Sequence, residues 1–284
     1  MATFYNQATL SFNGSTTTSN ITQGELRESL TITKTAVTDT YALGDDVTYI
    51  ISITNNSATE YSNILLSDDL GGYEVGAGTV YPLEYVEGSM RRYVNGDLTA
   101  PPTVTAGPPV SISAVEVPAN GNVILVYEAR ITQYAPPYVE GAITNTVTLT
   151  GDGVLTPITA QETISAASRA ALTISKSISP TVVSENGTLT YTFVIQNSGN
   201  VAATAEDTII VTDTFDPRLK NISVTYNGTA WTEGVNYTYS EATGLFTTAT
   251  GQITVPAAAY SQDAQTGAWT LTPGTAVITV KGTV

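Results

Sequence analysis

Short stretches of alternating apolar and polar residues, bounded by Gly, Asn, Pro or Asp, run along this chain of 284 residues. The alternation has a period of two, which is the spacing of side chains on one face of a β-strand. Clear examples are LTITK at 30–34, DDVTYIISITNNS at 45–57 and NGNVILVYEARI at 120–131. The pattern predicts short antiparallel strands throughout, and we predict no helix.

The order of these elements repeats once along the chain. The first copy contains LTITK (30–34), DDVTYIISITNNS (45–57), ILLSDDL (64–70), YVNGDL (93–98) and NGNVILVYEARI (120–131). The second copy contains LTISK (172–176), GTLTYTFVIQNSG (187–199), IIVTDTF (209–215), YNGTAW (226–231) and PGTAVITVKGTV (273–284). A match in order is stronger evidence than any single motif. We therefore expect an all-β fold with two immunoglobulin-like antiparallel β-sandwich domains in tandem.

The repeat also predicts where the domains begin and end. We place the first sandwich at 28–168 and the second at 169–284, with a linker near AASRAA at 166–171. The first 27 residues precede both copies, and we treat 1–27 as a separate N-terminal donor segment.

The donor segment resembles a part of the first domain that has no counterpart in the second. Residues 3–25 (TFYNQATLSFNGSTTTSNITQGE) match residues 142–162 (AITNTVTLTGDGVLTPITAQE). The matched residues are Asn6 with Asn145, Leu10 with Leu149, Ile21 with Ile158, and Glu25 with Glu162. The second copy stops at Val284 before it reaches such a hairpin. We expect the second domain to be incomplete and to be completed by the N-terminus of a neighbouring copy, which is β-augmentation.

One face of the expected donor strand carries the side chains for this role. They are Phe4, Asn6, Ala8, Leu10 and Phe12. Donation to a neighbour joins unlike surfaces head to tail, and a contact of this kind that does not close into a ring gives an open filament. The alternative is a hairpin that docks on its own chain.

Composition excludes several classes of function. The net charge is −15, which disfavours nucleic acid and anionic membrane surfaces as partners. The chain has no Cys and no His, so disulfides, thiol nucleophiles, His-based catalysis and Cys/His zinc sites are absent. We expect no cofactor, no metal, no membrane insertion and no enzymatic turnover, only autocatalytic cross-linking.

Polar residues stand on the apolar face of their strands at matched places in both copies. They are Lys34, Asp68 and Asn145 in the first domain and Lys176, Asp213 and the donated Asn6 in the second. A buried unpaired charge costs several kcal/mol, so these residues need partners. They form either a buried ion pair bonded to the Asn, or a Lys–Asn amide made by a desolvated lysine, with the Asp polarising the Asn side chain.

Several of these segments resemble a known family. They are ITKTA, GDDVTYIISITN, LSDDL and ITNTVTLTG in the first domain, and ISKSI, GTLTYTFVIQN and VTDTFDP in the second. The chain is similar to bacterial surface repeats of the domain of unknown function 11, which are related to isopeptide-forming collagen-adhesin and fimbrial domains. It departs from them in LSDDLGG, which lacks the usual Pro, and in the missing terminal Asn strand of the second domain.

The resemblance implies a surface or fimbrial role and a specific bond chemistry. It implies an intramolecular Lys34–Asn145 bond assisted by Asp68, and an intermolecular Lys176–Asn6 bond assisted by Asp213. We thus expect a structural subunit of an extracellular bacterial filament or pilus-like fibre whose partners are copies of itself. The alternative is a monomeric surface adhesin, binding module or stalk. MATFYNQATL shows no signal peptide, so the expected export route is unknown.

Overall fold

The computed structural model describes residues 2–26 and 29–284. They form β-strands joined by turns, with one 3₁₀ turn at Ala205–Asp207. The chain divides into two compact units, one of residues 1–136 and 142–165 and one of residues 137–141 and 166–284. None of the described segments is a helix of the length and apolar character that crossing a bilayer requires.

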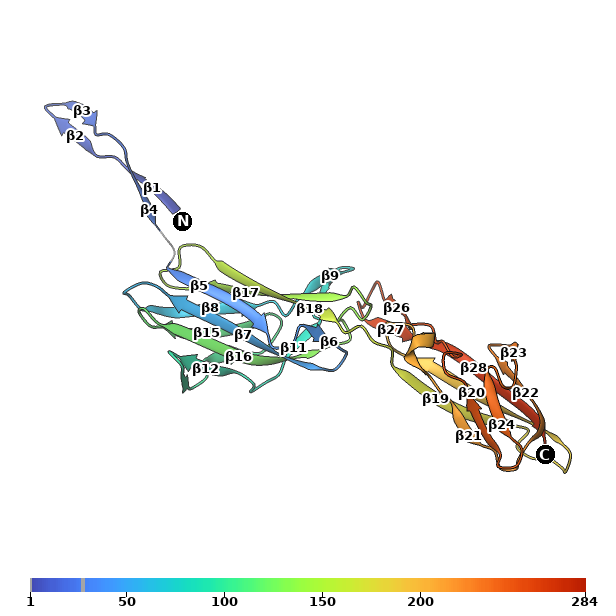
Figure 1. Cartoon of the computed structure of the whole chain (residues 1–284). Coiled ribbons are helices and arrows are strands. Elements are labelled where there is room, and N and C mark those ends of the chain that lie inside the picture. Colours follow the sequence, from blue (N-terminus) through green and yellow to red (C-terminus); the bar gives the residue numbers. More distant parts are fainter. Residues whose placement is uncertain (1, 27–28) are drawn as a thin grey trace. The chain divides into compact units, whose positions relative to one another are not determined.

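The first unit contains a sandwich of two antiparallel sheets (Figure 1). One sheet has the order β13 (Asp97–Thr99), β12 (Arg91–Val94), β16 (Asn122–Ile131), β7 (Asp46–Asn55), β5 (Leu30–Ala36), and β11 (Leu83–Tyr85) also pairs with β16. The other has the order β14 (Thr103–Thr105), β15 (Val110–Val117), β8 (Tyr61–Asp68), β17 (Ala142–Thr150), β18 (Ile158–Ala166), β6 (Thr40–Tyr41). A small ribbon joins β9 (Tyr73–Val75) to β10 (Gly78–Val80).

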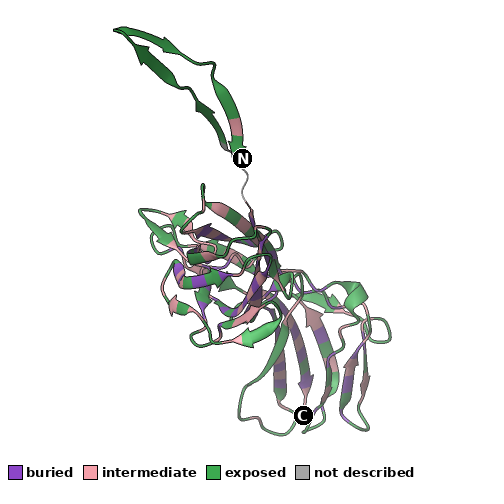
Figure 2. Ribbon diagram, turned by 90° about the vertical axis from the view of Figure 1, so that its left-hand side faces the viewer, coloured by how far each residue is buried: buried purple, intermediate pink, exposed green. Residues whose placement is uncertain are grey.

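The core of this sandwich follows the alternation of the strands. Every second residue of β7, β16 and β17 is buried, and the others are half-buried or exposed. Figure 2 shows the same alternation as purple bands along the strands. The fully buried side chains include Tyr49, Ile51, Ile64, Leu66, Leu125 and Tyr127. The period of two in the sequence therefore identifies the core faces correctly.

The second unit repeats the first of these sheets, without a described counterpart of β11. Its order is β19 (Leu172–Ser179), β20 (Thr188–Asn197), β28 (Gly274–Thr283), β22 (Lys220–Tyr226), β23 (Thr229–Trp231), which matches β5, β7, β16, β12, β13. The remaining strands are β21 (Thr212–Thr214), β25 (Leu245–Thr248), β24 (Tyr237–Ser240), and the pair β26 (Ala259–Gln262) and β27 (Trp269–Thr272). The chain is thus all-β, with two antiparallel sandwiches.

The two units differ beside the strand that carries the aspartate. In the first unit β8 pairs with β15 on one side and with β17 on the other. In the second unit β21 pairs with β25, and no described strand lies on its other side. The facing strand β19 exposes Leu172, Ile174 and Ile178. An unpaired edge beside exposed apolar side chains is a template for an added strand.

The N-terminal segment forms a β-hairpin. β1 (Ala2–Asn6) pairs with β4 (Thr22–Leu26), and β2 (Thr9–Phe12) pairs with β3 (Ser15–Thr18). Asn13 and Gly14 form the turn with φ values of 47° and 80°, as a two-residue hairpin turn of this kind requires. The hairpin is green along almost all of its length in Figure 2, and its large apolar side chains Phe4, Leu10 and Phe12 are exposed.

The register of the hairpin differs from that of the segment it resembles. In the first unit Asn145 lies opposite Glu162, so the sequence match would place Asn6 opposite Glu25. The structure instead pairs Asn6 with Thr22, and Glu25 with Thr3. The tight Asn13–Gly14 turn fixes the pairing of β2 with β3, because hairpin register follows from loop length and turn type, and one extra residue between β3 and β4 shifts the pairing of β1 with β4 by one.

A buried asparagine anchors each sandwich at the end of the second strand of the repeated sheet. In the second unit Asn197 Oδ1 accepts hydrogen bonds from the backbone N–H groups of Ala171 and Gly199, both at 2.9 Å. Its Nδ2 donates to the carbonyl groups of Val201 and Pro256, at 2.7 and 3.0 Å. One side chain therefore satisfies four buried or half-buried backbone groups that no strand neighbour reaches.

Asn55 has the matching place in the first unit. Its Nδ2 donates to the carbonyl groups of Thr59 and Pro118, and its Oδ1 accepts from the N–H group of Ser57. The shared asparagine explains why both copies end this strand in Asn.

We expect Asn197→Ala to lower the free energy of unfolding of the second domain by about 2 kcal/mol or more, because backbone groups lose their partners. Hydrogen exchange of the β20 and β28 amides measures this loss. Gln196→Ala, which removes the exposed neighbouring side chain, is the control and should cost about 0.5 kcal/mol or less. Equal effects of the two substitutions would contradict the anchoring role.

Candidate functional site

A lysine and an aspartate form an ion pair inside the first sandwich. Lys34 comes from β5 and Asp68 from the end of β8, so the pair joins the two sheets. Lys34 Nζ lies 2.6 Å from Asp68 Oδ2, and the two side chains are 0% and 1% exposed. Asp68 Oδ1 also accepts from the backbone N–H group of Leu70 at 3.2 Å. The alternation rule therefore places both groups correctly.

Tyr127 of β16 connects this pair to Asn145 of β17. The Tyr127 hydroxyl donates to Asp68 Oδ2 at 2.6 Å and accepts from Asn145 Nδ2 at 3.1 Å. Asn145 is fully buried, and its Oδ1 has no hydrogen-bond partner among the described residues. Lys34, Asp68, Tyr127 and Asn145 thus form one connected buried cluster, in which Asp68 reaches Asn145 through the tyrosine.

Two tyrosine rings enclose the ammonium group of Lys34. Its Nζ lies 5.1 Å from the centroid of the Tyr49 ring and 5.9 Å from that of Tyr127. The rings stack on each other with centroids 5.6 Å apart. Ring faces attract a cation, but they replace water only in part.

Burial governs the protonation of the cluster. Desolvation lowers the pKa of Lys34, and the negative charge of Asp68 opposes this effect without reversing it. Desolvation, with the charge of Asp68 as a smaller cause, raises the pKa of Tyr127 well above its ordinary value. A lower pKa brings the nucleophilic neutral form of a lysine within easier reach, and a tyrosine that keeps its proton is a hydrogen-bond donor.

Sequence reasoning predicted three members of the cluster and missed the fourth. Tyr127 and Tyr49 both stand at inward positions of their strands, next to apolar residues. Inward tyrosines in a sandwich ordinarily pack the core, so the alternation gives no sign of a polar role. A signal for Tyr127 was Lys34 itself. A lysine on an inward face needs polar partners, and the hydroxyl groups of inward tyrosines can supply them.

The second unit holds the matching ion pair in a different environment. Lys176 of β19 pairs with Asp213 of β21, and the Lys176 ammonium lies 4.5 Å from the centroid of the Tyr191 ring. The Lys176 side chain is 39% exposed, whereas that of Lys34 is sealed. The pair is open because the second unit has no described strand in the place of β17.

Asn6, the expected partner of Lys176, lies in the hairpin. It ends β1, opposite Thr22, and its side chain is exposed. The other residues of the expected donor face are also exposed: Phe4, Ala8, Leu10 and Phe12.

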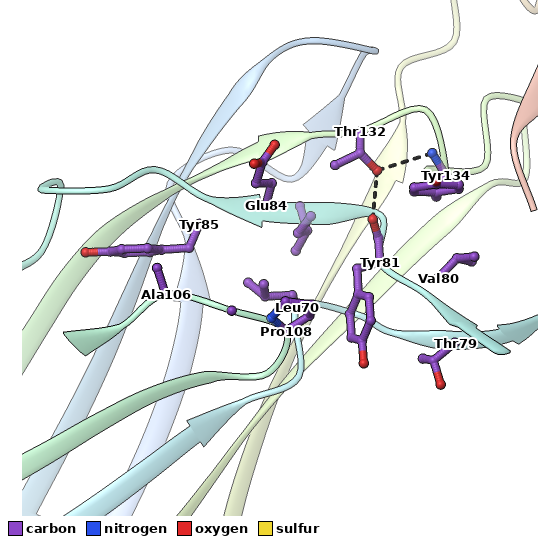
Figure 3. Close-up of a pocket in the computed structure, with 12 residues that line it drawn as sticks. Leu70, Thr79, Val80, Tyr81, Glu84, Tyr85, Ala106, Pro108, Thr132 and Tyr134 are labelled. Carbon is purple, nitrogen blue, oxygen red and sulfur yellow. Dashed lines mark hydrogen bonds between the residues drawn. The ribbon is translucent and has the colours of Figure 1, made fainter.

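A separate pocket opens in the first unit (Figure 3). It encloses about 490 Å³, and its lining includes Tyr81, Tyr85, Tyr134, Pro108 and Glu84. Its walls are mainly aromatic and apolar, and Figure 3 shows the hydroxyl of Thr132 bonded to the backbone of Tyr81 and Tyr134. Concave sites with mainly apolar walls and a few polar groups are common where proteins bind small molecules.

Comparison with known proteins gives structural likenesses only. No family model matches the chain, and no curated protein matches it. A 35 kDa C-terminal fragment of the major pilin of Streptococcus agalactiae is 12% identical, over 52% of this chain and 58% of the fragment, with a TM-score of 0.37. The major pilin subunit of Bacillus cereus is 11% identical, over 96% of this chain and 73% of that chain, with a TM-score of 0.39.

A third similar structure is the collagen-binding domain of a Staphylococcus aureus adhesin. It is 9% identical, over 49% of this chain and 99% of that domain, with a TM-score of 0.31. This chain spans less than two thirds of the Streptococcus agalactiae fragment. TM-scores below 0.5 do not establish a shared fold or function, so the function proposed below rests on the buried groups and the sequence.

Removing the aspartate from each ion pair should lower the free energy of unfolding of the two domains by different amounts. In an Asn145→Ala background, where no amide can form, we expect Asp68→Ala to destabilise the first domain by about 3–5 kcal/mol, because a buried charge loses its partner. Asp213→Ala should cost the second domain about 1 kcal/mol or less, because water reaches Lys176.

Hydrogen exchange of the β7 and β16 amides reports the first domain, and that of β20 and β28 the second. Equal losses in the two domains would mean that the environments of the two pairs do not differ in the way their exposure indicates.

Proposed function

We propose that this protein is the structural subunit of an extracellular bacterial filament or pilus-like fibre. Its hairpin completes the second sandwich of a neighbouring copy, head to tail. Autocatalytic amides, Lys34–Asn145 within a subunit and Lys176–Asn6 between subunits, then lock the fibre. The fibre needs no cofactor and no enzyme turnover, and its partners are copies of the same chain.

One contrast carries the proposal. The same Lys–Asp pair is sealed by β17 and its Asn145 in the first unit and is open beside β21 in the second. The hairpin has the missing type of element: a strand with an Asn and exposed large apolar side chains. Burial of Phe4, Leu10 and Phe12 would contribute roughly 5–9 kcal/mol before ordering costs.

The first unit supplies the expected register of donation. There Val147 lies opposite Asp68 and Leu149 opposite Leu66. Transferred to the matched positions, Ala8 lies opposite Asp213 and Leu10 opposite Val211. Asn6 then stands two residues before Ala8, as Asn145 stands two before Val147, on the face that carries the lysine.

The bond chemistry follows from the composition of the cluster. A neutral Lys34 Nζ attacks Asn145 Cγ, a carbon–nitrogen bond forms, and the bond from Cγ to Nδ2 breaks with release of one ammonia. Burial makes it easier for the Lys34 ammonium to release a proton, because it lowers the pKa of Lys34. The two groups are held in one network, so the reaction is effectively unimolecular.

A second candidate function is a monomeric surface adhesin or binding module. The aromatic pocket of Figure 3 favours it, since such pockets bind small molecules or peptide side chains. In that case the hairpin docks on its own chain and no fibre forms.

Engineered cysteines can test the direction and the register of donation together, because the chain has no cysteine of its own. We expect a Leu10→Cys protein mixed with a Val211→Cys protein to give a disulfide-linked heterodimer, since the two positions face each other across the junction. Ser11→Cys, shifted by one residue to the other face of the strand, is the matched control and should give little cross-linking with Val211→Cys.

The outcome is read on a non-reducing denaturing gel. A double variant that forms only an internal disulfide, at any protein concentration, would support docking within one chain and contradict the fibre.

Boiled samples on a denaturing gel test the covalent junction. We expect the unmodified protein to give a ladder whose bands lack one ammonia per bond by intact mass. Asn6→Ala should still form fibres, which fall apart into monomers in hot detergent. Deletion of residues 1–12 should give monomers even under native conditions. A detergent-resistant ladder from Asn6→Ala would show that Asn6 is not the cross-link.

A further inference from the structure

We propose that Tyr127 is a catalytic residue that carries a proton from Asp68 to the leaving nitrogen of Asn145, and that the second domain lacks this group. The inference rests on the proposed amide chemistry and goes beyond it. It predicts that the bond within a subunit forms much faster than the bond between subunits.

The geometry of the cluster places the Tyr127 hydroxyl between the base and the leaving group. It donates to Asp68 Oδ2 at 2.6 Å, the same oxygen that lies 2.6 Å from Lys34 Nζ. It accepts from Asn145 Nδ2 at 3.1 Å, and this nitrogen must leave as ammonia. An amide nitrogen leaves poorly without a proton, and Tyr127 is the hydroxyl in contact with it.

The proton path can be written with every atom accounted for. Asp68 takes one proton from the Lys34 ammonium, and the free amine attacks Asn145 Cγ, which places a negative charge on Oδ1. Tyr127 gives its proton to Nδ2 and regains one from Asp68. Asp68 then takes the second proton from the attacking nitrogen. The bond from Cγ to Nδ2 breaks, ammonia leaves, and the new amide remains beside a protonated Asp68 and an intact Tyr127.

Buried tyrosines suit this role because they keep their proton. Desolvation and the nearby charge of Asp68 raise the pKa of Tyr127, so the hydroxyl stays neutral and works as a relay that gives and regains a proton. The hydroxyl is also fixed in place, since hydrogen bonds hold it on both sides and the ring stacks on Tyr49.

The second domain provides a natural comparison. Tyr127 lies opposite Tyr49 in the pairing of β16 with β7, and Val280 lies opposite Tyr191 in the pairing of β28 with β20. Tyr49 and Tyr191 each follow their lysine by the same distance in the sequence, so Val280 holds the place of Tyr127.

A different ring stacks on the matching tyrosine of the second domain. Phe215 stacks on Tyr191 with centroids 4.7 Å apart, as Tyr127 stacks on Tyr49. Phe215 follows Asp213 by two residues, where the first domain has Leu70 after Asp68. The aromatic packing of the cluster is therefore kept in the second domain, but the hydroxyl is lost.

Hydroxyl deletion on the full-length protein tests the inference. We expect Tyr127→Phe to slow the loss of ammonia from Lys34 and Asn145 by at least about tenfold, since a positioned acid or base contributes on the order of 10²–10⁴-fold. Intact mass after cell-free synthesis, followed over time, measures the rate. Tyr85→Phe is the matched control, because it removes a hydroxyl from another ring beside Tyr127, with ring centroids 6.1 Å apart, and Tyr85 lines the pocket of Figure 3.

The outcomes separate the inference from the proposed function. Unmodified protein that never loses ammonia would overturn both. Unmodified protein that reacts while Tyr127→Phe reacts as fast as Tyr85→Phe would overturn the relay alone. Hydrogen exchange of the β7 and β16 amides shows that each variant is folded, so a slow reaction is not mistaken for a loss of structure.

The reciprocal change should install the relay in the second domain. We expect the double variant Val280→Tyr and Phe215→Leu to form the intermolecular bond about tenfold faster or more than the parent chain, because it imports the arrangement of the first domain. Folding and strand donation are checked in the same background by the disulfide between Leu10→Cys and Val211→Cys. A variant that donates its strand normally but shows no gain in rate would contradict the inference.

Discussion

The burial of one lysine ammonium is the constraint around which the first sandwich is arranged. Removing such a charge from water costs several kcal/mol, which only close partners can offset. Asp68 supplies the opposite charge from the other sheet, and Tyr49 and Tyr127 supply ring faces. The strand that carries Asn145 excludes water from this group, so β17 decides whether the lysine is sealed.

In the second domain the matching lysine is only partly shielded from water. Lys176 pairs with Asp213 and lies against the Tyr191 ring, yet more than a third of its side chain is in contact with solvent. The large apolar side chains Leu172, Ile174 and Ile178 of β19 are also exposed to solvent. The exposed lysine and the exposed apolar side chains both lie beside the open edge of β21. A single added strand with an inward Asn and large apolar residues would cover them together.

Whether a feature of this structure can be predicted from the sequence depends on the physical rule that determines it. Alternation with a period of two places Lys34, Asp68 and Asn145 on inward faces, because one face of each strand is buried. It does not reveal the role of Tyr127, because an inward tyrosine is ordinary core packing until its hydroxyl partners are known. The repeat predicted which strands of the two domains correspond, and β19, β20 and β28 take the sheet positions of β5, β7 and β16.

The register of the hairpin differs from the one that the sequence match implies, and for a different reason. The match between residues 3–25 and 142–162 aligns side chains along the chain, but the turn determines how β2 pairs with β3, and one extra residue before β4 shifts the pairing of β1 with β4. Asn13–Gly14 is a strong two-residue turn signal, and it overrides the longer connection implied by the match.

This difference in register does not change the order of side chains along β1 and β2, and that matters for how the proposed fibre would assemble. In the proposed fibre, the residues that would meet β21 belong to β1, to β2 and to the Gln7–Ala8 link between them, and their order along the chain is independent of what lies opposite them on β3 and β4. The hairpin already holds these strands extended, with the Phe4 ring lying over Gly24 of the paired strand. A strand that is ordered before it binds loses less conformational entropy on docking, so more of its apolar burial becomes binding free energy. The pairing of β1 with β4 would thus serve the donor strand as β18 serves β17, holding it straight while its other edge stays free for the open sheet.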